Sequence, residues 1–242
     1  MAISRKTDNV PDHLQPENEN QNSSQQDESS PQSIENERIA TYATWVEAFG
    51  TFVSAVGSNP SLNTQIANNL NTVGNTIQAV STAVVADTEE TWNLNKAGNV
   101  IDAIGLTEEA AVTILNIQNQ TEQLILTIQG NLIQIVGVGL STLYSLEQPP
   151  TLPNIYSFYG NATELSGLFI EVSGEVQQLR NNAQATAVTT NLNVLGNWVQ
   201  VVGAVIAAIG QSLSYEEAIQ KNSVSQDSFG YASRKRLPSP YY

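Results

Sequence analysis

Few side chains in this sequence are of a type that carries out chemistry. The 242 residues include no cysteine and a single histidine, His13, so disulfides, thiolate metal sites and cysteine nucleophiles are excluded. His13 lies in a polar stretch that we predict to be disordered, where nothing would hold a metal ligand or general base rigidly. Carboxylates occur in adjacent pairs at Glu89–Glu90, Glu108–Glu109 and Glu216–Glu217. Neighbouring residues on a helix point about 100° apart, so we expect helix starts or exposed faces there, not acid–base pairs.

Sequence motifs for ligand binding are absent as well. There is no Walker phosphate loop, no strand-linked dinucleotide fingerprint, no His-Glu-x-x-His, no calcium loop and no nucleophile elbow. Val136-Gly137-Val138-Gly139 lies inside a helical pattern, which favours helix packing over phosphate binding. We therefore predict no catalytic residue, no cofactor and no metal.

The charge balance narrows the range of partners. Lys and Arg number 9 against 23 Asp and Glu, for a net charge of −14, which argues against general binding to nucleic acid or anionic lipid. Charged residues make up 13% of the chain, about half the share of roughly 25% expected of a soluble domain. The N-terminus lacks the apolar core of a secretory signal, so we expect a cytoplasmic protein.

Composition divides the chain into three parts. Residues 1–37 are rich in Asn, Gln, Ser, Glu and Pro and contain too few aliphatic residues to offset the entropy of ordering. Residues 222–242 have a similar composition. We predict disordered tails at 1–37 and 222–242 around a helical repeat domain at 38–221.

One short motif recurs through the central part. Its pattern is G-N-x-x-Q-x-x-G, and six copies begin at Gly50, Gly74, Gly98, Gly130, Gly160 and Gly196. The copy at Gly160 is the most degenerate, with Thr163 and Ser166 at positions that are apolar elsewhere. Because the intervals between copies differ, we expect a motif carried on helices of unequal length and not a strict solenoid.

Hydrophobic spacing predicts that these elements are helices. Apolar residues recur in steps of three and four, most clearly at Leu192, Leu195, Val199, Val202, Ile206, Ile209 and Leu213. Breaks are predicted at Ser58–Pro60, Asp87–Thr88, Gly105–Glu109, Pro149–Pro153 and Asn181–Asn182. Glu89, Glu90, Glu108 and Glu109 would then lie in first helical turns. The expected fold is an all-α irregular bundle of about six helices.

The motif glycines form a second pattern. Residues seven apart on a helix lie about 20° apart around its axis, so the paired glycines of one copy face the same way. Glycine costs a helix about 1 kcal/mol relative to alanine, and close approach of a neighbouring helix would offset this cost. The predicted helix-packing glycines are Gly50, Gly57, Gly74, Gly98, Gly105, Gly130, Gly137, Gly160, Gly167, Gly196, Gly203 and Gly210.

The motif also carries a polar stripe. The Asn after each glycine and the polar residue three positions later project together, as Asn197 and Gln200 do. We expect this stripe to be a solvated face. The alternative is that stripes pair with like stripes on other chains.

Two segments are apolar enough to raise a membrane interpretation. Leu124–Leu146 and Leu192–Leu213 exceed twenty residues without a charge, the length that a bilayer span requires. Both contain Asn or Gln, which are costly in hydrocarbon. Membrane insertion is therefore kept as an alternative.

Two segments carry a resemblance to known proteins. Residues 45–57 and 196–210, which include Gly50-Thr-Phe-Val-Ser-Ala-Val-Gly57 and Gly196-Asn-Trp-Val-Gln-Val-Val-Gly203, resemble a repeat of uncharacterised repetitive proteins from Bacillus-type bacteria. The resemblance covers most of residues 40–213. It implies a bacterial repeat protein and assigns no activity to any residue.

These observations favour a non-enzymatic structural or protein-interaction module. Its expected partners are proteins, including copies of itself associating through the glycine-lined faces, and nucleic acid is not among them. The alternative is a membrane-active or membrane-embedded protein with a membrane localisation. A carrier of an apolar ligand is a third interpretation, to which no particular residue points.

Overall fold

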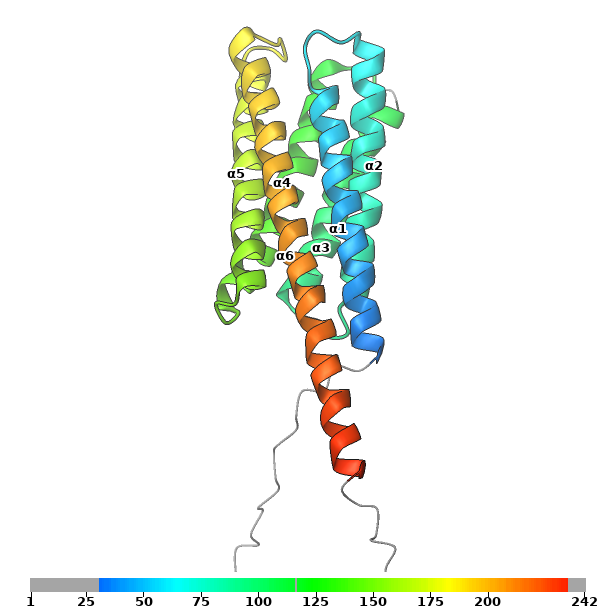
Figure 1. Ribbon diagram of the computed structural model, residues 1–242. Coiled ribbons are helices and arrows are strands. Elements are labelled where there is room, and N and C mark those ends of the chain that lie inside the picture. Colours follow the sequence, from blue (N-terminus) through cyan, green and yellow to red (C-terminus); the bar gives the residue numbers. More distant parts are fainter. Residues whose placement is uncertain (1–30, 116, 235–242) are drawn as a thin grey trace, which may run out of the picture.

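The computed structural model describes residues 31–115 and 117–234, and within them all regular structure is helical (Figure 1). The prediction of an all-α bundle of about six helices is confirmed. The helices are α1 (Pro31–Gly57), α2 (Thr64–Thr88), α3 (Leu94–Ile114), α4 (Gln120–Glu147), α5 (Leu152–Arg180) and α6 (Ala187–Arg234).

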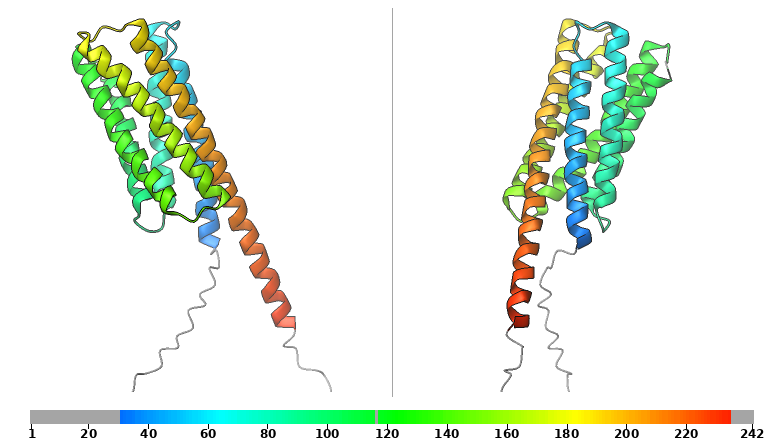
Figure 2. Two further views of the ribbon diagram at one scale, coloured as in Figure 1. Left: turned by 90° about the vertical axis from the view of Figure 1, so that its left-hand side faces the viewer. Right: turned by 45° about the vertical axis from the view of Figure 1, so that its right-hand side comes forward.

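The six helices form a closed ring around a common axis. Each helix contacts only its two neighbours in the chain, and α6 contacts α1, which closes the ring. Neighbours run antiparallel, so the α1–α2, α3–α4 and α5–α6 loops lie at the upper end in Figure 1 and the other two loops at the lower end. The last part of α6 extends beyond the lower end (Figure 2).

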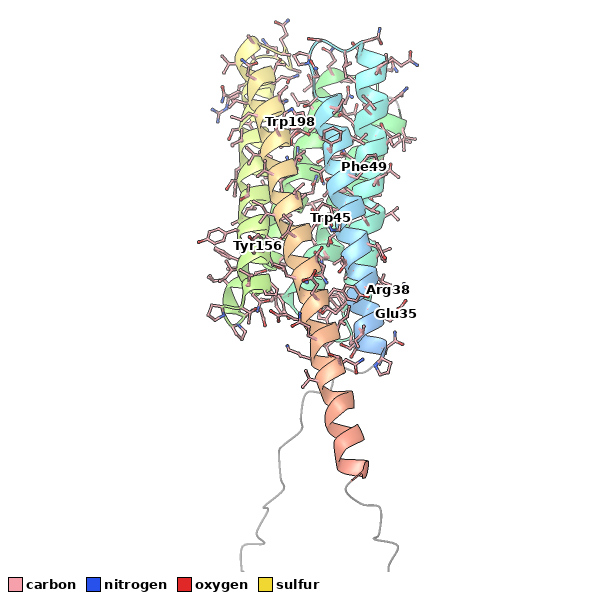
Figure 3. The ribbon with its side chains drawn as sticks, in the orientation of Figure 1. Glu35, Arg38, Trp45, Phe49, Tyr156 and Trp198 are labelled. Carbon is pink, nitrogen blue, oxygen red and sulfur yellow. The ribbon has the colours of Figure 1, made fainter. Side chains whose placement is uncertain are left out.

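Aromatic side chains line the junction that closes the ring. The Trp45 indole of α1 donates a hydrogen bond to the Ser212 hydroxyl of α6, 3.0 Å away. Higher up, the rings of Phe52 and Trp198 meet edge to face with centroids 5.9 Å apart. Trp45 and Trp198 lie along this junction in Figure 3.

Asparagine caps start three of the helices. The side chains of Asn63, Asn93 and Asn119 each accept a hydrogen bond from a backbone N–H in the first turn of α2, α3 and α4. Capping of this kind satisfies donors that have no partner within the helix. The helix starts are therefore encoded locally.

One predicted break is wrong and one real break was missed. α3 continues through Gly105, so Glu108 and Glu109 lie in the middle of a helix, while Glu89 lies at the end of α2. Gly105 stays helical because it packs against α4. The missed break ends α3 at Ile114, and its signal was Asn119 with Glu122 three residues later, the spacing of an N-terminal capping motif.

The helices also extend past the predicted domain limits of 38 and 221. α1 begins at Pro31, where Glu35 and Arg38 form an exposed ion pair (Figure 3). Gln211 of α6 donates to the carboxylate of Glu37 at 2.7 Å, which ties the start of α1 to α6. Residues 1–30 and 235–242 of the predicted tails lie outside the described residues.

Glycines set the close packing inside each pair of antiparallel helices. At all twelve predicted positions, an added Cβ would lie 2.1–2.9 Å from an atom of the partner helix of the same hairpin. Gly50 faces Gly74, Gly105 faces Gly130, and Gly167 faces Gly196. The glycine-lined faces are thus filled within the chain and are not free for a second copy.

Candidate functional site

The polar stripe of the repeated motif faces the inside of the ring. Gln78, Asn131, Gln134 and Gln200 are 1–7% exposed, and Asp102 and Glu164 are 5% and 8% exposed. The expectation of a solvated outer face is therefore wrong. The glycines hold each hairpin together at its edge, so the positions just after them turn inward and the apolar heptad positions turn outward.

The interior holds two cavities, one above the other. The upper cavity has a volume of about 500 Å³, receives side chains from all six helices and extends to the upper loops at Asn59 and Pro60. The lower cavity has a volume of about 330 Å³ and extends to the lower end at Glu37 and Gln148. Most of their lining side chains are Asn, Gln, Ser, Thr and Glu.

Three carboxylates in the upper cavity are hydrogen-bonded by amides. Glu109 of α3 accepts from Asn75 of α2 at 2.8 Å and from Gln134 of α4. The Glu175 carboxylate accepts from the Asn131 amide at 3.0 and 3.1 Å. Glu171 accepts from two amides of α6, Asn197 at 2.8 Å and Gln200 at 2.6 Å.

These bonds belong to a network that crosses every helix junction from α1 to α6. On the α1–α2 side, Thr51 donates to the Gln78 side chain at 3.0 Å and Ser54 donates to Asn75 at 2.7 Å. We call this set of bonds the interior network. It provides hydrogen-bond donors to all three carboxylates of the upper cavity, as polar burial requires. The Oδ1 atoms of Asn71 and Asn193, which also line this cavity, are buried without a hydrogen-bond partner.

Three further carboxylates, which we call the lower cluster, lack such amide partners. They are Glu47 of α1, Asp102 of α3 and Glu164 of α5, and no Asn or Gln side chain donates to any of them in the described structure. Glu47 and Glu164 line the lower cavity. The Oδ1 atom of Asp102 is buried and has no hydrogen-bond partner.

No basic side chain balances these six carboxylates. Within the described residues, the sole ion pair between side chains joins Glu35 and Arg38 on the exposed start of α1. The cavity linings contain no Lys, Arg or His. No group of three or more described His, Cys, Asp or Glu residues has the spacing to hold a metal ion. Any counter-charge must therefore enter the interior from outside.

Buried apolar side chains stand between the polar positions of three helices. Leu106 follows Asp102 by four residues and precedes Glu109 by three, so it shares their inward face, and Leu168 occupies the same place between Glu164 and Glu171. Leu106 and Leu168 are 3% and 1% exposed, and Val138 lies at the corresponding place on α4. We call Leu106, Val138 and Leu168 the apolar layer.

Glu37 marks the lower mouth of the interior. It lines the lower cavity and accepts the hydrogen bond from Gln211. Burial raises the pKa of Glu37, and the hydrogen bond from Gln211 acts in the opposite direction. The mouth is thus acidic and partly desolvated.

The outer surface of the ring is uncharged and carries large apolar side chains on every helix, with some exposed amides and hydroxyls among them. Large side chains that point outward include Tyr42 at 65% exposure, Phe49 at 58% and Val136 at 54%. We define the apolar belt as the outward-facing side chains of residues 39–57, 64–86, 97–114, 123–146, 152–179 and 187–215. The belt contains no exposed charged side chain, and its one carboxylate outside the interior clusters, Glu108, is half-buried.

Exposed hydroxyls in the belt are satisfied by their own helices. Thr76, Thr107, Ser166 and Ser173 each donate to the carbonyl oxygen four residues earlier, at 2.7–2.8 Å. Such back-bonding removes the need for water at a hydroxyl. The degenerate copy at Gly160 fits here, because Ser166 and Thr163 both bond in this way.

Apart from Glu108, charged side chains outside the interior gather at the two ends. Arg38, Asp87, Lys96 and Glu147 lie at the lower end, and Glu122 and Arg180 lie at the upper end. By length and composition, two of the six described helices are apolar enough to cross a membrane. Gln120–Glu147 and Ala187–Val224 contain 18-residue stretches with mean hydropathy of 1.6 and 1.7.

Sequence reasoning identified the motif but not the role of its polar positions. The third residue after the motif Asn is Asp102 in one copy and Glu164 in another, where other copies have Gln or Ser. The replacement of an amide by a carboxylate at this repeated position was the sequence signal that could have identified these residues as a functional site. Glu47 and Glu175 lie outside the motif, and only the ring brings them inward.

Comparison with known proteins gives one match. Residues 38–224 match the model of a family described as a family of unknown function (DUF6944). No curated protein and no solved structure matches the chain.

Proposed function

Since the chain belongs to this family of unknown function, we propose its function from its own geometry: it is a non-enzymatic, membrane-embedded helical barrel. The apolar belt contacts lipid, and the polar interior forms a hydrophilic path between the two ends. We further propose that its relatives are the repetitive proteins of Bacillus-type bacteria that share its glycine–asparagine motif.

The observation that carries the proposal is the inverted polarity of the ring. Asn131 and Gln134 are buried, while their neighbours on α4, Leu132 and Val136, are 48% and 54% exposed. Burial of apolar surface stabilises by about 25 cal/mol per Å², and an apolar surface that encircles a soluble monomer would forgo this gain. In a bilayer, the same surface is in its preferred environment.

The dimensions of the helices agree with this location. The shortest helix, α3, has 21 residues, which at 1.5 Å per residue corresponds to about 30 Å. The hydrocarbon core of a bilayer is also about 30 Å thick. All backbone groups inside the helices are satisfied by the helices themselves, as hydrocarbon requires.

The distribution of basic residues supports an orientation. Among the described residues, every Lys and Arg except Arg180 lies at the lower end or on the part of α6 that extends beyond it: Arg38, Lys96, Lys221 and Arg234. Short basic segments stay on the cytoplasmic side of a membrane. We therefore propose that the lower end faces the cytoplasm.

A second candidate is a soluble interaction module whose belt is covered by other protein surfaces, including copies of itself. The mean hydropathy of the chain, −0.18, favours this candidate, as does the presence of Gln129 and several amides on the outer surface. Since the glycine faces are filled, its contacts would have to use the apolar belt.

Flotation of the full-length protein separates the two candidates. We expect it to sediment with membranes after alkaline carbonate washing, to need detergent for extraction, and to float with liposomes after reconstitution. A detergent-free, monodisperse oligomer that stays at the bottom of the gradient would exclude the membrane proposal and support the interaction module.

A further inference from the structure

We propose that the interior of the barrel is a pathway for small monovalent cations, with the lower cluster as its binding station and the apolar layer as its closed gate. This inference rests on the proposed membrane location. It concerns which ions enter the interior, and this depends on the interior side chains and not on the outer surface.

The charge of the interior side chains determines whether a cation or an anion is bound. Besides Glu37 and Glu89 at the lower mouth, six carboxylates face the two cavities or lie between them, and no basic side chain lines either cavity. An ionised carboxylate away from water is strongly unfavourable unless an opposite charge approaches it. A cation or a proton supplies that charge, and an anion is repelled.

The two carboxylate groups differ in how well they are satisfied. Glu109, Glu171 and Glu175 accept hydrogen bonds from five amide side chains of the interior network. In the lower cluster, Asp102 is 5% exposed and its Oδ1 atom has no partner. The carboxylates of Glu47 and Glu164, to which no amide donates, line the lower cavity, so we assign binding to the lower cluster.

The lower cavity has room for a hydrated ion. Its volume of about 330 Å³ corresponds to about ten water molecules at about 30 Å³ each. Beside the carboxylates of Glu47 and Glu164, its wall carries the neutral side chains of Asn99, Ser145 and Asn161. Because the carboxylates lack the spacing to ligate a metal ion directly, the cation would be held through its water shell, which oxygen groups of these kinds contact.

The apolar layer supplies the gate, and its Leu106 lines the upper cavity. Leu106, Val138 and Leu168 stand between the polar positions of α3, α4 and α5 and are at most 6% exposed. A narrow apolar constriction excludes water and blocks ions without any charged gate. Shortening these side chains would join the two cavities into one path.

Electrical recording of purified, reconstituted protein tests the pathway. In a planar bilayer with a KCl gradient, we expect Leu168→Ala and Leu106→Ala to conduct about tenfold more than the wild type or better, because the constriction is lost. Phe169→Ala is the matched control, since Phe169 is exposed on the belt one residue away. We expect the reversal potential to lie closer to the equilibrium potential of K⁺ than to that of Cl⁻.

A substitution in the lower cluster tests the binding station. Asp102→Asn in the Leu168→Ala background is expected to shift the reversal potential toward zero by weakening cation preference. Glu108→Gln on the same helix removes a half-buried carboxylate outside both clusters and is expected to leave the reversal potential unchanged. Replacing K⁺ with N-methyl-glucamine under a pH gradient distinguishes K⁺ from protons, because a remaining current whose reversal potential follows the pH gradient is carried by protons.

The outcomes separate this inference from the membrane assignment. Protein that fails to float with liposomes refutes the proposed function itself. Protein that floats, retains its helical circular dichroism and yet shows no current in either leucine variant, or an anion-selective current, overturns the cation pathway and leaves the membrane location intact. An equal effect of Asp102→Asn and Glu108→Gln would refute the assignment of the lower cluster.

Discussion

Gly137 and Gly139 lie two residues apart on α4 and have opposite surroundings. A Cβ at Gly137 would lie 2.5 Å from the backbone nitrogen of Asp102 and 2.7 Å from the carbonyl oxygen of Gly98. A Cβ at Gly139 would have no heavy atom within 4 Å. A glycine at the motif position is therefore the one at which the neighbouring helix approaches closely, and a glycine elsewhere on the same helix is not.

This difference predicts opposite effects of one substitution. Gly137→Ala should lower the free energy of unfolding by about 1–3 kcal/mol, because rigid backbone of α3 must move away. Gly139→Ala should be neutral or raise it by up to about 1 kcal/mol through helix propensity. Thermal unfolding in detergent measures both, and equal effects would contradict the packing role of Gly137.

Asn131 and Gln129 offer a second test at the scale of single residues. The Asn131 amide holds the buried Glu175 carboxylate, so Asn131→Leu should destabilise the protein by about 1–3 kcal/mol. Adding Glu175→Gln should recover part of the loss, because the unpaired acceptor is then neutral. Gln129 is exposed on the same helix, and Gln129→Leu should leave the unfolding temperature unchanged or raise it.

At the scale of elements, the repeating unit is a hairpin of two antiparallel helices. Hairpins α1–α2 and α5–α6 repeat the same contacts: Gly50 with Gly74 corresponds to Gly167 with Gly196. In both, the side-chain oxygen of an Asn lies against a glycine of the partner helix, Asn71 against Gly57 and Asn193 against Gly174. Asn71 and Asn193 each end an Asn-Leu-Asn segment three residues before a motif glycine, so this segment takes part in helix packing.

The loops between the helices predict where the chain meets each aqueous side. Because the sequence has no cysteine, single cysteines report accessibility without background. Asn59→Cys and Gln184→Cys in the upper loops should react with an impermeant maleimide from outside intact cells. Thr91→Cys and Pro150→Cys in the lower loops should react only after permeabilisation. Labelling of all four from one side would contradict a spanning topology.

For the molecule as a whole, the main question is whether lipid or water surrounds the ring. Val136 is at the middle of α4 and faces outward. Val136→Lys should cost about 2.5–3.5 kcal/mol in membrane insertion and reduce the membrane-bound fraction, as measured by carbonate extraction. Glu147→Lys, at the end of the same helix, is the control and should remain membrane-bound. A soluble module would tolerate both changes equally.

The sequence by itself determined much of the fold. Heptad spacing and the asparagine, proline and glycine signals predict six helices and most of their limits, because these depend on residues within a few positions of each other. The motif also identifies the glycines and polar positions that recur. Gly105 is the instructive failure, since its packing against α4 keeps it helical where local signals predicted a break.

Only the tertiary structure decided which face of each helix points inward. An amphipathic period defines two faces, but it does not say which one meets the neighbours. Here each hairpin is joined through its glycines at the boundary between the two faces, and closing the ring then turns Asn131 and Gln200 inward and Val136 and Val202 outward. The carboxylate clusters follow from the same closure, because Glu47, Asp102 and Glu164 come from three helices that are distant in sequence.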